Sequence, residues 1–249
     1  MLMKSLTALP VYNEAKYIDG VLEQVLRYSP DVLVVDDGST DGTAELLSAR
    51  SDVARIRHEH NQGYGAALRS AFQYAVENSY DVLVTIDCDG QHEPQRIPEF
   101  VAAATSADIV SGSRYLDTFD GQSVPPEARR RINAEVTAEV NRRLGLKLSD
   151  AFCGFKAYRR DALEKLHITE TGYAMPLEVW VQAACAGLKI AELAVPLIYL
   201  DESRSFGGSL DDARTRLAYY YEVLDRMIGA QAVPPPHASA KLIGREVAG

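Results

Sequence analysis

The stretch LVTIDCDGQHEP (residues 83–94) joins an apolar run to a polar turn that carries two carboxylates one residue apart. The run predicts a buried strand, and Gly90 allows the chain to bend directly after it. Such a bend can turn Asp87 and Asp89 toward one site. Paired carboxylates suit Mg²⁺ or Mn²⁺, which keep coordination positions for water and for phosphates. The alternative is an acidic turn that only caps the next helix, because motifs this short often occur by chance.

Strands and helices alternate on both sides of this stretch. Strands are expected at residues 5–10, 31–36, 53–59, 81–87 and 108–113, with helices at 17–27, 42–50, 65–77 and 94–104. This order predicts an α/β fold with a mostly parallel central sheet flanked by helices on both faces. The polar clusters PVYNE, DDGSTDGT, NQGYG and DCDGQH each follow a strand. Since ligands of such sheets bind beyond the carboxyl ends of the strands, we expect the four clusters to meet on one rim.

The second half of the chain has a different pattern. A polar loop at 117–131 leads into a helix that ends near Leu144, followed by a shorter segment at 150–166, a helix at 176–187, a strand at 189–200, a loop at 201–209 and a last helix at 212–228. Three consecutive prolines and no regular period follow. We therefore predict one domain over residues 1–229, divided into halves at 1–115 and 116–229, and a flexible C-terminal tail at 230–249.

Composition restricts the class of protein. A chain of 249 residues that is 47% hydrophobic can bury one enzyme-sized core. The net charge of −9 argues against a nucleic-acid partner. Three scattered cysteines without zinc-site spacing indicate a reducing compartment. Because we find neither a secretory signal nor an apolar run of about 18 residues, we expect a cytoplasmic protein, either soluble or peripheral at the membrane.

The second and third polar clusters point to a nucleotide. In VVDDGSTDGT (residues 34–43), Asp36 and Asp37 stand at a strand end, where a carboxylate can accept hydrogen bonds from a ribose or a nucleobase. The alternative assigns this whole segment to turn and helix-cap chemistry. In NQGYG (residues 61–65), the two glycines permit close backbone approach at the start of a helix.

In this order, PVYNE, VVDDGSTDGT, NQGYGAAL, DCDGQHEP and SGSR resemble the nucleotide-sugar-binding half of an inverting family 2 glycosyltransferase with the A-type (GT-A) fold. RRRIN, LSDAFCGFKAYRR, MPLEVWVQAACAG and SRSFGGS extend the resemblance to the dolichyl- or polyprenyl-phosphate mannosyltransferase branch. The resemblance implies a nucleotide-diphospho-sugar donor (GDP-mannose or a UDP-sugar), a lipid-phosphate acceptor, Mg²⁺ or Mn²⁺ as cofactor and peripheral membrane contact. It would place the donor in the half at 1–115 and the acceptor in the half at 116–229, and it predicts no particular oligomeric state.

The resemblance also assigns roles by position. The nucleotide-sugar would be held by Pro10, Tyr12, Glu14, Asp36, Asp37, Asp87 and Arg204. The cation would be held by Asp87, Asp89 and Gln91. The acceptor phosphate would be contacted by Arg114 and by one of Arg129, Arg130 and Arg131. Two positions depart from the family pattern, because Tyr64 and Leu210 stand where the family often has lysines.

The chemistry follows from the charges. A metal, held by Asp89 and its neighbour, and Arg114 would stabilise the departing nucleotide diphosphate. A phosphate acceptor is already anionic and needs no general base, whereas a hydroxyl acceptor needs a carboxylate. Glu178 and Asp150 are the candidates for that base, although they could instead anchor an arginine and cap a turn. The alternatives to lipid-phosphate transfer are a glycosyltransferase with a hydroxyl acceptor and a non-catalytic nucleotide-sugar-binding subunit.

Overall fold

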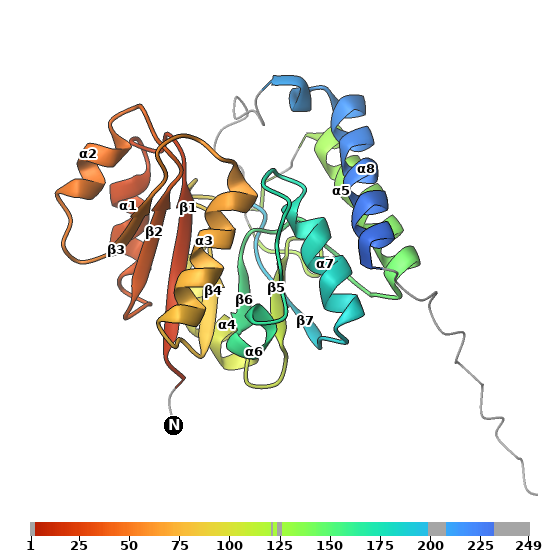
Figure 1. Cartoon of the computed structure of the whole chain (residues 1–249), viewed down its shortest axis with the longest axis horizontal. Helices are drawn as coiled ribbons and strands as arrows, with labels where there is room; N and C mark the ends of the chain where they lie inside the picture. The colour runs from red at the N-terminus through yellow and green to blue at the C-terminus, as the bar shows by residue number, and fades with distance from the viewer. Residues whose placement is uncertain (1–2, 121, 124–125, 199–207, 232–249) are drawn as a thin grey trace, which may run out of the picture.

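A seven-stranded sheet forms the centre of the computed structural model (Figure 1), which describes residues 3–120, 122–123, 126–198 and 208–231. The strands are β1 (Ser5–Val11), β2 (Val32–Asp36), β3 (Ala54–Arg57), β4 (Val82–Thr85), β5 (Ile109–Ser113), β6 (Lys156–Arg159) and β7 (Ile190–Ala194). Their order in the sheet is β3-β2-β1-β4-β6-β5-β7. All neighbouring pairs are parallel except those that β6 makes with β4 and β5. The predicted α/β fold with a mostly parallel sheet is confirmed.

Helices cover both faces of the sheet. They are α1 (Ile18–Val25), α2 (Thr43–Ser48), α3 (Tyr64–Glu77), α4 (Ile97–Ala103), α5 (Glu127–Leu144), α6 (Arg160–Leu163), α7 (Met175–Cys185) and α8 (Ala213–Gln231). The side chains of β1 alternate between two cores, since Leu6 and Ala8 pack with α3, α5, α7 and α8, whereas Leu9 and Val11 pack with α1 and α4. A strand buried on both faces needs apolar residues throughout, which explains the continuous runs in the sequence.

β6 was not predicted as a strand. The expected shorter segment at 150–166 contains this four-residue antiparallel strand, which separates β4 from β5. Its sequence KAYR has two charged residues and no apolar run, so it carries no periodic pattern. The register pairs Thr85 with Lys156, so β6 brings Lys156 and the preceding Gly154 beside the polar end of β4.

α8 closes the described part of the chain and lies beside α5 (Figure 1). It extends to Gln231, so the domain boundary predicted after Gly229 falls inside a helix. The tail predicted at 230–249 lies outside the described residues from 232 onward. Within the part of the chain that the structure describes, no helix is both long enough and apolar enough to cross a membrane.

Candidate active site

A pocket of about 640 Å³ opens at the carboxyl ends of the parallel strands. It is lined by residues that follow β1, β2, β3, β4 and β5, and by side chains from α5 and α8. This volume is within the range of typical small-molecule sites, roughly 300–1,000 Å³. The predicted convergence of the four polar clusters on one rim is confirmed, because parallel strands bring their carboxyl ends to the same edge.

The floor of the pocket contains the two carboxylates after β4. The pocket is lined here by Asp87, Asp89 and Gln91. Asp89 Oδ1 accepts a hydrogen bond from the backbone N–H of Gln91 at 2.9 Å. Two carboxylates and an amide oxygen are the hard ligands that suit Mg²⁺ or Mn²⁺. Among the described residues, no three His, Cys, Asp or Glu side chains form a group that could hold a metal. The donor set therefore fits a cation that takes its remaining ligands from water and from substrate phosphates.

Asp87 is fixed from several sides. Its Oδ1 accepts a hydrogen bond from the Tyr64 hydroxyl at 3.1 Å, and its Oδ2 lies 3.4 Å from His92 Nε2. A Cβ at Gly154 would lie 2.1 Å from Oδ2, so only glycine leaves room for this carboxylate. Burial alone would raise the pKa of Asp87, but the contact with His92, then Tyr64 and the charge of Lys156, hold that pKa below its ordinary value. Asp87 is therefore an anion at neutral pH.

Tyr64, which is partly buried, and Lys156, which is buried, support these carboxylates. Burial and the charge of Asp87 raise the pKa of Tyr64 well above its ordinary value, so the phenol keeps its proton and remains a hydrogen-bond donor. Lys156 is buried near Asp87, and its Nζ donates to the carbonyl oxygen of Cys153. Burial lowers the pKa of Lys156, although Cys153, Asp150 and Asp87 oppose that effect.

The residues expected to bind the nucleotide-sugar differ in whether they line the pocket. Pro10, Tyr12 and Glu14 line the pocket, and the Tyr12 side chain is exposed. Asp37 also lines it, but Asp36 is buried outside the pocket lining, where its Oδ1 accepts a hydrogen bond from the Ser39 amide at 2.9 Å. The structure therefore brings together four of the five donor residues from these first two loops and not Asp36.

Asp37 organises the neighbouring loop. Its carboxylate accepts hydrogen bonds from the amides of Gln62 at 3.0 Å and Gly63 at 2.7 Å, and it pairs with His58 Nδ1 at 2.6 Å. The other ring nitrogen of His58 contacts Ser70 Oγ at 2.9 Å. The role of His58 could not be found from the sequence, because the contact depends on bringing β3 against the end of β2.

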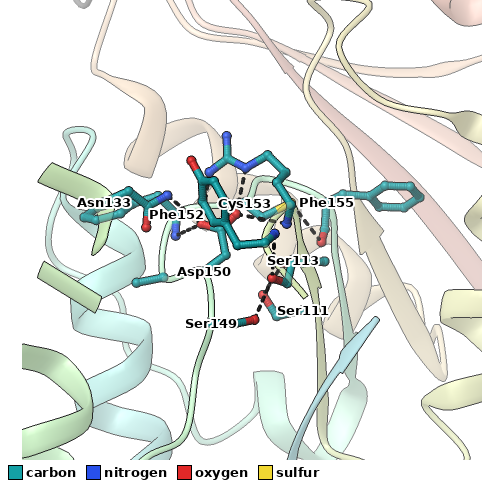
Figure 2. A network of polar contacts seen from close by, with 12 residues as sticks. Ser111, Ser113, Asn133, Ser149, Asp150, Phe152, Cys153 and Phe155 are labelled. Carbon is teal, nitrogen blue, oxygen red and sulfur yellow. Dashed lines mark hydrogen bonds and ion pairs between the residues drawn. The ribbon is translucent and has the colours of Figure 1, made fainter. Parts of the chain in front are cut away.

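Arg114 is held at the pocket by the buried carboxylate of Asp150. Asp150 Oδ2 accepts from Arg114 Nε at 2.7 Å, and Asp150 Oδ1 accepts from Arg114 Nη2 at 3.0 Å. Figure 2 shows Asp150 beside Asn133, whose Nδ2 donates to Asp150 Oδ1 at 2.8 Å. Burial would raise the pKa of Asp150, but Arg114 lowers that pKa to about 2. The charge of Asp150 raises the pKa of Arg114 above its ordinary value against the effect of burial. Asp150 does not line the pocket, so its place is that of an anchor for Arg114.

Only one of the three consecutive arginines lines the pocket. Arg129 does so from the first turn of α5, whereas Arg130 and Arg131 are exposed and do not. Arg216 of α8 is a further lining cation that sequence reasoning missed. It is buried and donates from Nη1 to the carbonyl oxygen of Leu210 at 2.6 Å. An arginine in an amphipathic helix resembles a solvent-facing residue, so its place depends on how α8 packs. Arg204 lies outside the described residues.

Glu178 does not reach the pocket. It is buried in α7, and its Oε2 accepts hydrogen bonds from the amides of Thr169 at 2.8 Å and Glu170 at 2.7 Å. Its Oε1 accepts from Thr169 Oγ1 at 2.8 Å and Gln182 Nε2 at 3.1 Å. Both oxygens are used to hold the loop before α7. The structure therefore does not bring Glu178, the candidate base, to the pocket.

Aromatic side chains form much of the remaining wall. Tyr64 and Tyr173 stack with ring centroids 5.8 Å apart and an interplanar angle of 20°. On the side of α5 and α8, Phe152 and Tyr220 line the pocket with centroids 4.8 Å apart. The pocket thus combines a carboxylate floor, three arginines and an aromatic wall.

The arrangement of strands and helices is the A-type (GT-A) fold. The structure is similar to glucosyl-3-phosphoglycerate synthase from Mycobacterium tuberculosis solved with Mn²⁺, UDP and glucosyl-3-phosphoglycerate, with a TM-score of 0.67 and 19% identity over 94% of this chain and 82% of that chain. The same enzyme solved with Mg²⁺ and UDP gives a TM-score of 0.68. At this identity the likeness establishes the fold.

The chain belongs to glycosyl transferase family 2, whose sequence profile matches residues 7–167. It is 33% identical over 244 residues to undecaprenyl-phosphate mannosyltransferase from Micrococcus luteus, which covers 91% of this chain and 100% of that protein. It is 32% identical to polyprenol monophosphomannose synthase from Mycolicibacterium smegmatis, with 86% of each chain covered. It is also 32% identical to dolichyl-phosphate hexose transferase from Haloferax volcanii, over 74% of this chain and 78% of that protein. The protein is therefore a glycosyltransferase enzyme.

Proposed function

We propose that this enzyme transfers a hexose, mannose in the first instance, from a nucleotide-diphospho-sugar to a polyprenyl phosphate, with a divalent cation and with inversion at the anomeric carbon. One observation carries the choice of acceptor. Asp150 and Glu178, the two carboxylates that the sequence suggests as bases for a hydroxyl acceptor, are both buried outside the pocket and engaged in hydrogen bonds. A phosphate monoester needs no base, because it is already anionic at neutral pH.

The donor would lie over the carboxylate floor. Asp87, Asp89 and Gln91 would hold Mg²⁺ or Mn²⁺, and the nucleoside would lie toward Pro10 and Tyr12. The bound cation would neutralise the negative charge that the diphosphate gains as it leaves. The pairing of Mn²⁺ or Mg²⁺ with UDP in solved structures of the same fold supports this arrangement.

The acceptor would enter between α5 and α8. Arg114, Arg129 and Arg216 bring positive charge to that side of the pocket, which an anionic acceptor needs in a protein of net charge −9. Ile132, Phe152, Leu197 and Tyr220 line the same side and would contact the first isoprene units. The names of the Micrococcus and Mycolicibacterium relatives support a polyprenyl-phosphate mannose product. Such an acceptor would bring the enzyme to a membrane surface.

The reaction would be a single displacement. An acceptor phosphate oxygen attacks the anomeric carbon on the face opposite the nucleotide diphosphate, the new C–O bond forms as the bond to the diphosphate breaks, and the configuration inverts. Arg114, fixed by Asp150, keeps its charge near the reacting phosphates throughout.

A donor panel tests this proposal. Purified enzyme is incubated with GDP-mannose, UDP-glucose or UDP-N-acetylglucosamine, with a short-chain polyprenyl phosphate, and with Mg²⁺, Mn²⁺ or excess chelator. We expect one donor to give a polyprenyl-phosphate hexose of inverted configuration by NMR, and only with metal. Wild-type rates in chelator would refute the cation, and a retained configuration would refute the single displacement.

A further inference from the structure

Tyr64 begins α3 at a place where the backbone is tightly constrained. The Gly65 amide donates to the Thr171 carbonyl at 2.7 Å, and a Cβ at Gly65 would lie 2.2 Å from the Glu170 carbonyl oxygen. Gly63 has a φ of 105°, and a Cβ there would lie 2.3 Å from the Thr171 carbonyl oxygen. The backbone on both sides of Tyr64 therefore lies directly against the loop before α7. This contact fixes the position of the Tyr64 Cα.

The ring of Tyr64 is fixed as well. It stacks on Tyr173, which comes from the same loop two residues after Thr171. An offset stacked pair of this kind resists rotation of either ring, and such pairs contribute stability beyond their buried area. With its backbone and its ring both held by this loop, Tyr64 presents its hydroxyl at one defined point.

That point is the inner carboxylate of the candidate cation site. The hydroxyl donates to Asp87 Oδ1 at 3.1 Å, while Oδ2 is confined by His92 at 3.4 Å and by the absence of a side chain at Gly154. Each oxygen of the carboxylate therefore has a polar contact, and its rotation is limited by groups from α3 and from the turn after β4. A phenol does this without placing a positive charge beside a divalent cation, because it is neutral at pH 7.

We propose that Tyr64 is a positioning residue of the cation site, whose hydroxyl sets the orientation in which Asp87 receives Mg²⁺ or Mn²⁺. This inference rests on the proposed cation site at Asp87 and Asp89. Groups that orient metal ligands affect metal affinity by roughly 10- to 100-fold when they are removed, because a misoriented ligand must be reordered on binding. The hydroxyl, rather than the ring, carries this role.

The direct test is a titration of the protein with Mn²⁺ in the absence of substrate, in which the EPR signal measures the free Mn²⁺. Tyr64→Phe removes the hydroxyl and keeps the stacked ring, and we expect it to weaken Mn²⁺ binding about tenfold. Tyr64→Leu removes ring and hydroxyl together and should show a similar loss. Tyr74→Phe makes the same chemical change on the same helix, where the Tyr74 ring stacks on Tyr80, and should bind as wild type does.

A kinetic readout separates positioning from a general loss of structure. In Tyr64→Phe the Mn²⁺ concentration for half-maximal rate should rise about tenfold, while the rate at saturating Mn²⁺ stays within about threefold of wild type. Mn²⁺ binding by Tyr64→Phe within twofold of wild type would overturn the inference while leaving the cation site intact, provided that Asp89→Ala abolishes binding. Equal Mn²⁺ binding by wild type and Asp89→Ala would refute the cation site itself, and the inference with it.

Discussion

Arg114 depends on Asp150 for its position at the pocket. The pair is bidentate, and Asp150 is fully buried with further hydrogen bonds from Asn133 and from the Phe152 amide. We expect Asp150→Asn to lower the free energy of unfolding by about 3 kcal/mol at pH 7, because it leaves a guanidinium largely buried without its counter-ion. Urea denaturation of the two proteins measures this difference, and a loss under about 1 kcal/mol would contradict the assignment.

The same pair predicts a pH dependence with a definite sign. The folded pKa of Asp150 is about 2, below the value of about 4 for an unfolded Asp. A depressed folded pKa stabilises the fold fully above the unfolded pKa, and this stabilisation is lost as the pH falls through the folded pKa. The stability gap between wild type and Asp150→Asn should therefore be constant above about pH 4 and shrink toward pH 2. A gap that is independent of pH over this window would show that the charge of Asp150 is not what stabilises the fold.

Gly154 gives a second test at single-residue scale. A Cβ there would lie 2.1 Å from Asp87 Oδ2 and 2.6 Å from its Cγ, so Gly154→Ala must displace the carboxylate. We expect kcat/KM to fall at least about tenfold with little change in thermal stability. Gly20→Ala is the matched control, because nothing lies within 4 Å of a Cβ at this position of α1, and it should be fully active and slightly more stable. Full activity of Gly154→Ala would argue against a precisely held Asp87.

Adjacent residues show which details of the site can be predicted from the sequence and which cannot. The two acids at the end of β2 could be placed near a ligand from their position alone, yet only Asp37 lines the pocket. Because neighbouring residues leave a strand on opposite sides, the pattern could not decide which acid turns inward. Arg129 differs from Arg130 and Arg131 for a comparable reason, since only one face of a helix can meet the pocket.

At the scale of elements, α7 holds the loop that carries Tyr173. Glu178 accepts hydrogen bonds from two amides and a hydroxyl of residues 169–170, so it links the helix to the pocket wall. Glu178→Gln should cost about 1–3 kcal/mol of stability, because one oxygen becomes an amide donor facing other donors. Turnover at a temperature where the variant is folded should remain within about fivefold of wild type. Near-complete loss in a folded variant would restore Glu178 as a base and indicate a hydroxyl acceptor.

The first turn of α5 offers a matched pair for the acceptor. Arg129 lines the pocket, whereas Arg130 is exposed beside it. Arg129→Ala should raise the KM for polyprenyl phosphate about tenfold, the loss of one charge-assisted hydrogen bond, and leave the KM for the donor within about twofold. Arg130→Ala should change neither. Equal effects of the two changes would indicate a diffuse electrostatic contribution instead of a contact.

β6 marks the limit of prediction for elements. Strands β1, β2 and β4 could be found because strands buried on both faces are continuous apolar runs. β6 is short and charged, and its stability comes from pairing on both sides with β4 and β5. That pairing brings the buried Lys156 close enough to Asp87 for their charges to interact. Because its neighbours stabilise β6, no pattern within its own four residues predicts a strand.

At the scale of the whole molecule, the pocket is formed by the ends of the sheet strands and by two packed helices. The rim at the ends of β1 to β5 follows from a parallel sheet, so the sequence could predict its residues loop by loop. The opposite wall depends on α5 and α8, which contribute Arg129, Ile132, Arg216 and Tyr220 from positions far apart in the chain. Their convergence depends on helix packing, and so the α8 residues were missed.

The discrimination between an acceptor phosphate and an acceptor hydroxyl tests the proposed function most directly. The measurement is kcat/KM for a short-chain polyprenyl phosphate and for the matching polyprenol, with the active donor and saturating Mn²⁺. Because no base is required and the pocket presents arginines to an anion, we predict that the phosphate is used at least about a thousandfold better. Comparable rates for the two acceptors, or transfer only to a soluble hydroxyl compound, would contradict a polyprenyl-phosphate glycosyltransferase.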